Sequence, residues 1–142
     1  MATERVYAVW EYCDGIRTGI ADFMGSPHHF EQEGSEERQN YLSTFLLKPI
    51  AQATLAQVLE QWQIFRAWEA AFHRGEVAQH THPGLPGRNA RYAELEAMLN
   101  VTVQGHSSIC QRAGGAFSLV PAQPSVPKGV MREVQVEWQH VA

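Results

Sequence analysis

Charged residues are scarce in this sequence, and the basic ones are the scarcest. Charged side chains make up 18% of the chain, against about a quarter in a typical globular protein. The 11 lysines and arginines are outnumbered by 15 aspartates and glutamates, for a formal net charge of −4. Proteins that bind nucleic acids neutralise phosphates with clustered basic residues, and no such cluster occurs here. The composition therefore argues against nucleic acid as a partner.

Long apolar runs are also missing. A membrane-spanning helix needs about 20 apolar residues, and the longest candidates here are broken by Glu, Gln or Pro. The first residues, Met1 to Arg5, pass directly into an alternating pattern, without the charged start and apolar stretch of a signal peptide. We therefore expect a cytoplasmic protein that has no membrane partner.

Cysteine is rare, and the motifs of well-known enzyme families are absent. Cys13 and Cys110 lie far apart without a Cys-x-x-Cys pair, so their spacing predicts neither a zinc site nor a redox motif. Two reduced thiols are the ordinary interpretation, and a single disulfide is the alternative. The sequence contains no Gly-x-Ser-x-Gly, no phosphate-binding loop, no Gly-x-Gly-x-x-Gly and no His-Glu-x-x-His. These absences favour a protein without catalytic activity and without a cofactor.

Much of the first third of the chain alternates with a period of two, the pattern of a β-strand. Turns separate the alternating segments: Asp14-Gly15 suits a two-residue type I′ turn, and Gly25-Ser26-Pro27 makes a second turn. The acidic stretch 33–40 is expected to be a loop. The predicted strands are Val6–Cys13, Ile16–Phe23, His28–Gln32 and Tyr41–Leu47.

The first hairpin also allows a prediction of strand register. With two residues in the loop, Trp10 lies opposite Gly19 and Val9 lies opposite Ile20. The indole of Trp10 would then cover the bare backbone of Gly19 on one face of the sheet.

A long amphipathic helix is predicted from Leu55 to Arg74. Thr54 to Gln57 fits a capping box, and Gly75 is placed as the C′ residue that ends the helix. A helix of about 20 residues is about 30 Å long, enough to span a small domain. Its apolar side chains recur at helical spacing and are Leu55, Val58, Leu59, Trp62, Phe65 and Phe72.

The second half of the chain is less regular. A loop over Glu76–Gly87 precedes a shorter helix over Ala90–Leu99, with Tyr92, Leu95 and Leu99 as its inner stripe. The pattern over residues 101–110 decides neither for helix nor for strand. The remaining predicted elements are a strand over Ala116–Val120, a proline-rich loop over Pro121–Lys128 and a strand over Val130–Gln139.

This order of strands, helices and strands favours an α+β fold. We expect an antiparallel sheet or a partly open β-barrel, built from the N-terminal meander and the C-terminal strands and packed against one long and one short helix. All 142 residues are assigned to a single domain, because this length is a common domain size. No internal repeat occurs, which excludes solenoids and propellers.

One polar cluster on the predicted long helix stands out. Arg66 and Glu69 are three residues apart, and Glu69 and His73 are four apart, so the carboxylate can meet the guanidinium on one side and the imidazole on the other. This trio is either a binding site for a polar ligand, with His73 as a candidate general base, or a buried ion pair that fixes the register of the helix against the sheet.

Histidine and tryptophan supply the other candidate residues. The seven histidines include the pairs His28-His29 and His80-x-His82, but no cysteine or carboxylate completes either pair, so no metal site is predicted. The four tryptophans, Trp10, Trp62, Trp68 and Trp138, either pack in the core or line a pocket between sheet and helix. Trp68 lies at the edge of the apolar stripe and, if exposed, would mark a partner surface.

Two functional hypotheses follow. The favoured one is a non-catalytic binding or protein-interaction module, with a protein partner or self-association into a homodimer. The alternative is a small enzyme or polar-ligand-binding domain that uses Arg66, Glu69 and His73, with Trp68 beside them. Neither hypothesis identifies a small-molecule ligand.

Overall fold

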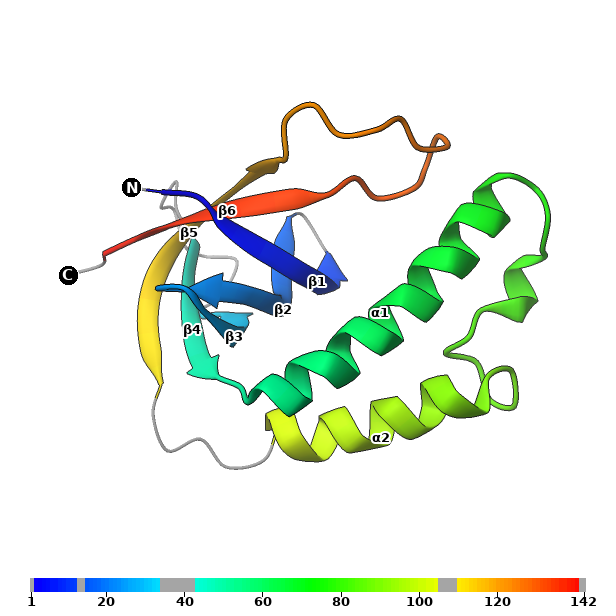
Figure 1. The fold of residues 1–142 in the computed structure, drawn as a ribbon, viewed down its shortest axis with the longest axis horizontal. Coiled ribbons are helices and arrows are strands. Elements are labelled where there is room, and N and C mark those ends of the chain that lie inside the picture. Colours follow the sequence, from blue (N-terminus) through cyan, green and yellow to red (C-terminus); the bar gives the residue numbers. More distant parts are fainter. Residues whose placement is uncertain (1, 13–14, 34–42, 105–109, 141–142) are drawn as a thin grey trace.

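A closed six-stranded barrel and a pair of helices beside it make up the fold (Figure 1). The computed structural model describes residues 2–12, 15–33, 43–104 and 110–140. Each strand pairs antiparallel with the next, and β6 returns to β1 through Glu4↔Val136 and Arg5↔Gln135. The strands are β1 Glu4–Tyr12, β2 Ile16–Phe23, β3 Ser26–Gln32, β4 Ser43–Pro49, β5 Gln111–Leu119 and β6 Val134–Gln139. The predicted α+β class is confirmed.

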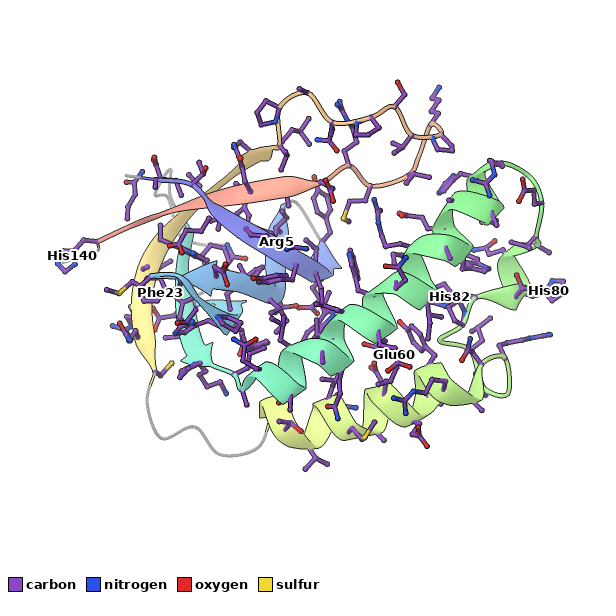
Figure 2. The ribbon with its side chains drawn as sticks, viewed as in Figure 1. Arg5, Phe23, Glu60, His80, His82 and His140 are labelled. Carbon is purple, nitrogen blue, oxygen red and sulfur yellow. The ribbon has the colours of Figure 1, made fainter. Side chains whose placement is uncertain are left out.

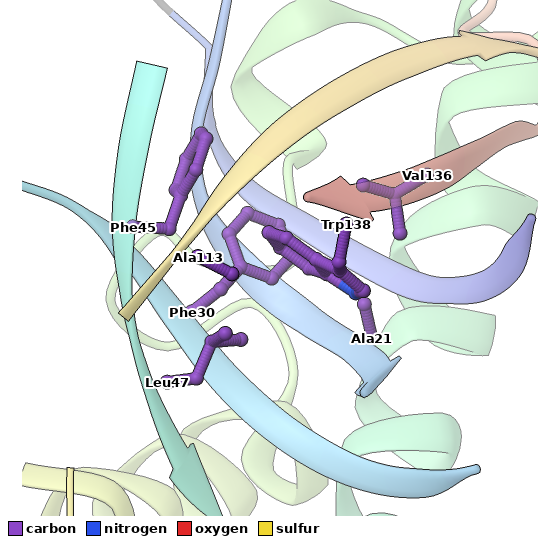
Figure 3. Packing of buried hydrophobic residues seen from close by; sticks show 7 residues of the cluster. All are labelled: Ala21, Phe30, Phe45, Leu47, Ala113, Val136 and Trp138. Carbon is purple, nitrogen blue, oxygen red and sulfur yellow. The ribbon is translucent and has the colours of Figure 1, made fainter. Parts of the chain in front are cut away.

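Aromatic rings fill the interior of the barrel (Figure 3). Phe30 lies 5.6 Å from Phe45 and 6.0 Å from Trp138, with the rings nearly edge to face, which is a favourable geometry for aromatic pairs. The indole N–H of Trp138 donates to the carbonyl of Asp22 at 2.8 Å. Because Trp138 packs inside the barrel, it does not line a pocket between barrel and helices.

The two helices lie side by side on the outside of the barrel (Figure 1). They are α1 Gln52–His73 and α2 Ala90–Gln104. A second apolar cluster joins Ala8 of β1 and Ile20 of β2 to Val58 of α1 and Leu99 of α2. The ends of the helices that are distant from this cluster extend beyond the barrel (Figure 1). No helix in the described part of the chain is both long and apolar enough to cross a membrane.

The predicted register of the first hairpin is wrong. Val9 pairs with Gly19 and Ala8 pairs with Ile20, because the pairing of β1 with β2 shifts at several positions. Three residues separate Tyr12 from its partner Ile16, and the predicted turn residue Asp14 is outside the described residues. Trp10 therefore does not cover Gly19. The ring of Phe30 does so: a Cβ on Gly19 would lie 2.8 Å from that ring and 2.2 Å from the carbonyl oxygen of Ala8.

The second turn is one residue earlier than predicted. Met24 and Gly25 both have positive φ, 54° and 82°, as the central residues of a type I′ turn require. Their N–H groups donate to the carboxylate of Glu4 at 3.0 and 2.8 Å. A side chain at the barrel's closing edge thus stabilises a methionine in a conformation that non-glycine residues rarely adopt.

The helix boundaries also differ from those predicted. The helix α1 begins at Gln52, after Ala51, and no side chain caps its first turn, so the predicted capping box is wrong. Leu59, placed in the apolar stripe, is 37% exposed. Gly75 has a φ of 78° and its N–H donates to the carbonyl of Phe72, which confirms its predicted role at the end of the helix. The helix α2 continues five residues beyond the predicted Leu99.

The strands of the second half begin and end elsewhere than predicted. β5 already starts at Gln111, so its two glycines lie within the strand, and β6 starts only at Val134. Residues 120–133 form the loop between them. Cys110 carries an exposed free thiol, while the residue considered as its disulfide partner, Cys13, is outside the described residues.

Candidate functional site

A cleft of about 490 Å³ lies between the outer wall of the barrel and the two helices. Its volume falls within the range of about 300 to 1,000 Å³ typical of small-molecule pockets. Strands β1, β2 and β3 form one wall, and α1 and α2 form the other. Its aromatic and imidazole rings are Trp10, His29, Trp62, Phe65, His82 and Tyr92. The remaining lining residues are Val9, Glu11, Thr18, Glu31, Gln61, Glu96, Leu99, Asn100 and Val103.

Strand alternation places His29 in this cleft. Phe30 points into the barrel, so its neighbour His29 points outward, toward the helices. The ring of His29 lies 5.8 Å from that of Trp10 on β1. The preceding residue, His28, is on the other face, where its ring meets Phe23 edge to face at 5.3 Å and its Nδ1 lies 2.8 Å from the carbonyl oxygen of Ser26.

His29 has an unusual environment for a polar side chain. It is only 6% exposed, and its Nδ1 has no hydrogen-bond partner among the described residues. Burial, reinforced by the positive charge of Lys48 on β4, lowers the pKa of His29 to about 4, so the imidazole is neutral at pH 7. A buried polar atom without a partner costs about 1–3 kcal/mol. The fold thus keeps a destabilising nitrogen in the wall of its cleft.

Three acidic side chains line the cleft. They are Glu11, Glu31 and Glu96, and no lysine or arginine is among the lining residues that the structure describes. Glu11 and Glu31 lie on either side of Thr18, which pairs with both across β1, β2 and β3. On the helical wall, the buried amide of Gln61 donates to Glu96 Oε1 at 2.6 Å. Burial, with Glu96 as the second cause, raises the pKa of Tyr92.

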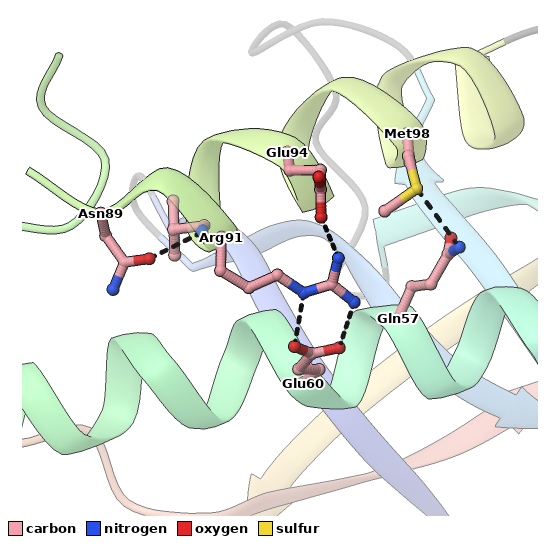
Figure 4. A network of polar contacts seen from close by, with 7 residues as sticks. Gln57, Glu60, Asn89, Arg91, Glu94 and Met98 are labelled. Atoms are coloured by element: carbon pink, nitrogen blue, oxygen red, sulfur yellow. Dashed lines mark hydrogen bonds and ion pairs between the residues drawn. The ribbon is translucent and has the colours of Figure 1, made fainter. Parts of the chain in front are cut away.

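Polar contacts between α1 and α2 fix the width of the helical wall (Figure 4). The guanidinium of Arg91 on α2 donates to both carboxylate oxygens of Glu60 on α1, at 2.6 and 2.7 Å, and also contacts Glu94. Asn89 accepts the backbone N–H of Tyr92 at 2.8 Å, which caps the first turn of α2. These contacts hold Tyr92 and Glu96 opposite the barrel.

Trp68 and His82 lie at the far end of the helices. The indole N–H of Trp68 donates to Thr81 Oγ1 at 2.8 Å, and its ring packs 4.6 Å from that of His82. These contacts tie the short 3₁₀ turn Gln79–Thr81 to α1. Figure 2 shows His82 turned toward α1 and His80 pointing away from it. Trp68 is partly buried by this turn, and its role as a partner surface stays a prediction.

The structure brings together two members of the predicted trio. Arg66 forms an ion pair with Glu69 Oε1, and Glu69 Oε2 accepts the backbone N–H of Met131 at 3.1 Å. His73 is exposed and packs against Gly129, where an added Cβ would lie 2.6 Å from the imidazole. Glu69 therefore anchors the loop between β5 and β6, and both of its carboxylate oxygens are used in doing so.

Arg66 lines a second hollow, a groove of about 410 Å³ between α1, β1 and the start of β6. Arg5 and Arg132 give this groove a basic character, partly offset by Glu133. Arg5 lies over the ring of Tyr7 at 4.6 Å (Figure 2 labels Arg5), and Arg66 lies 5.9 Å from the ring of Trp62.

Metal-ligating side chains do not converge in the described ranges. No group of three or more His, Cys, Asp or Glu residues among them is placed to hold a metal ion. Comparison with protein-family models, with curated proteins and with solved structures finds no match for this chain. The function must therefore be inferred from the geometry of the site itself.

The sequence indicated only part of this site. Trp10 and Trp62 do line a pocket between sheet and helix, as one of the two interpretations of the tryptophans expects. The spacing rules did not single out Gln61 or Glu96, and they placed Tyr92 only in the inner stripe of the second helix and His29 only in a histidine pair without a predicted metal site. For His29 the sequence did contain a signal, because alternation along a strand puts it on the opposite face of β3 from Phe30. The other three lie on two helices whose packing no local pattern predicts.

Proposed function

We propose that this protein is a non-catalytic binding module that takes a small molecule with an aromatic or apolar body into the cleft between barrel and helices. One observation carries the proposal: six aromatic and imidazole rings line a cleft of about 490 Å³, and one of them, His29, lies nearly buried in its wall with no partner for Nδ1 among the described residues. Concave sites of this size, with mostly aromatic and apolar walls and a few polar groups, are typical of small-molecule binding.

The lining of the cleft supports this choice of ligand. Rings from β1, both helices and the connecting loop face it, and aromatic walls contribute contact area with little loss of side-chain freedom. The trio gives the enzyme alternative no comparable support, because the carboxylate that would orient His73 is already bound to Arg66 and to the backbone of Met131. A cytoplasmic location and a protein or homodimer partner stay predictions.

Binding of indole to matched variants tests the proposal. Asn100 lines the cleft, and the neighbouring Val101, 76% exposed, does not. We expect saturable indole binding by calorimetry and a rise in Tm, both lost in Asn100→Trp, because the new ring fills the cleft. Val101→Trp adds the same side chain to the same helix and should bind like the wild type. Equal binding by both variants, or no saturable binding to the wild type, would refute the proposal.

A further inference from the structure

The charge distribution of the cleft specifies the class of ligand more closely than its shape does. Among the described residues its lining holds three carboxylates, two imidazoles and no lysine or arginine, and one of the imidazoles, that of His29, is neutral at pH 7. The three carboxylates would repel an anionic ligand, and a neutral ligand would leave them uncompensated wherever it displaced water from them. A cation is the complement to this lining.

The rings strengthen the case for an organic cation over a metal ion. Trp62 and Phe65 lie 5.3 Å apart on α1, and Tyr92 faces them from α2 within the same cleft. The faces of such rings attract ammonium groups through their quadrupoles. A metal ion would need several oxygen or nitrogen ligands converging on one point, and the described residues provide no such group.

The two walls of the cleft differ in charge, which orients the ligand. Near His29 the positive charge of Lys48 is close enough to lower the pKa of the imidazole, so a second cation is disfavoured there. On the barrel wall Glu11 and Glu31 flank Thr18, and Glu31 lies two residues from His29 on the same face of β3. On the helical wall Gln61 orients Glu96. The charged group of the ligand belongs beside Glu96 on the helical wall, and its apolar body belongs beside Trp10 and His29 on the barrel wall.

We propose that the cleft binds an aromatic amine, a molecule with a flat apolar body and a single ammonium group held by Glu96. This inference rests on the proposed binding function and adds the charge of the ligand to it. The acidic residues do not carry it alone, because the cleft itself and the Nδ1 of His29, for which the described ranges supply no partner, independently indicate a ligand.

Three probes that share one ring system separate the effect of ligand charge on binding from the effect of ligand shape. Tryptamine is cationic, 3-methylindole is neutral and indole-3-propionate is anionic, and all three carry the same ring system. By calorimetry at low salt, tryptamine should bind at least tenfold more tightly than 3-methylindole, and indole-3-propionate should bind more weakly than both. The preference for tryptamine should shrink at 1 M salt, because the added ions screen the carboxylates.

A matched pair of variants assigns the preference to Glu96. Glu96→Gln keeps an oxygen that can accept from Gln61 but removes the charge, so tryptamine should bind as weakly as 3-methylindole does while 3-methylindole is unaffected. Glu94→Gln removes one charge from an exposed position of the same helix that does not line the cleft, and it should leave the tryptamine preference unchanged. The Tm of both variants shows that they remain folded.

The outcomes distinguish the two proposals. If all three probes bind with equal affinity, or indole-3-propionate binds best, the charge inference is overturned and the binding function stands. If Glu94→Gln lowers tryptamine affinity as much as Glu96→Gln does, the preference reflects the net charge of the protein and the inference is likewise overturned. If none of the probes binds in a saturable way, both proposals fail.

Discussion

Val9 and Trp62 line two hollows at once, the acidic cleft beside α2 and the basic groove beside the start of β6. In the groove, Arg66 is paired with Glu69 and Arg5 lies over Tyr7. In the cleft, His29 is nearly buried, and its Nδ1 has no hydrogen-bond partner in the described part of the chain. Arg5 and Arg66 of the groove thus make contacts within the fold, whereas the cleft keeps a polar group that no described residue satisfies.

The largest expected effect concerns pH and the cleft. The pKa of His29 is about 4 in the folded protein, against 6.5 ordinarily. Between these values the unfolded chain binds the proton and the folded chain does not, so stability falls as the pH drops from 6.5 toward 4, by up to about 3 kcal/mol. Chemical denaturation at several pH values measures this loss. His29→Leu should lack that component, and an unchanged pH dependence in this variant would contradict the assignment.

The next effect concerns the groove. Glu69→Ala removes the partner of Arg66 and the acceptor for Met131 N–H, and we expect a loss of about 2 kcal/mol in the free energy of unfolding. The side chain of Arg66 is 24% exposed, which keeps the loss below that of a fully buried pair. Glu76→Ala breaks an exposed pair with Arg74 and serves as the control, with no measurable change. Equal stability of the two variants would show that Glu69 does not anchor the loop.

The smallest effect separates two neighbouring histidines. His29→Leu removes a ring whose Nδ1 has no hydrogen-bond partner among the described residues, and it should stabilise the protein at pH 7 by about 1 kcal/mol. His28→Leu removes a ring whose Nδ1 lies 2.8 Å from a carbonyl oxygen, and it should destabilise by a similar amount. Urea denaturation shows whether each variant is more or less stable than the wild type. A loss of stability in His29→Leu would mean that His29 serves the fold, and the contrast between cleft and groove would then be lost.

Local patterns predicted the strands and helices of this fold better than they predicted how these elements pair and pack. Alternation located β1, β2 and β3, and helical spacing located α1. The register of the first hairpin was predicted wrongly because it depends on irregular pairing along β1. No residue type in the sequence indicates this irregular pairing. Met24 has no glycine-like freedom, and its positive φ is supported by Glu4, twenty residues earlier in the chain.

In the candidate site, too, local patterns predicted contacts within one element but not contacts between elements. Helical spacing predicted the contact between Arg66 and Glu69, because both lie on one helix. It could not show that a backbone N–H from residue 131 would occupy the other oxygen of Glu69. The cleft draws its residues from three strands, two helices and a loop, so its composition depends on tertiary packing. Alternation along a strand placed His28 and His29 on opposite faces, but it did not show which of the two faces the helices.

The NMR signals of the tryptophan indole N–H groups provide the most direct test of the proposal that the cleft binds an aromatic amine. Trp10 and Trp62 line the cleft, whereas Trp138 lies inside the barrel with its N–H bound to Asp22. In ¹⁵N-labelled protein titrated with tryptamine, the account predicts that the signals of Trp10 and Trp62 move together and saturate while that of Trp138 stays in place. Absence of saturable movement at Trp10, or equal movement at Trp138, would contradict it.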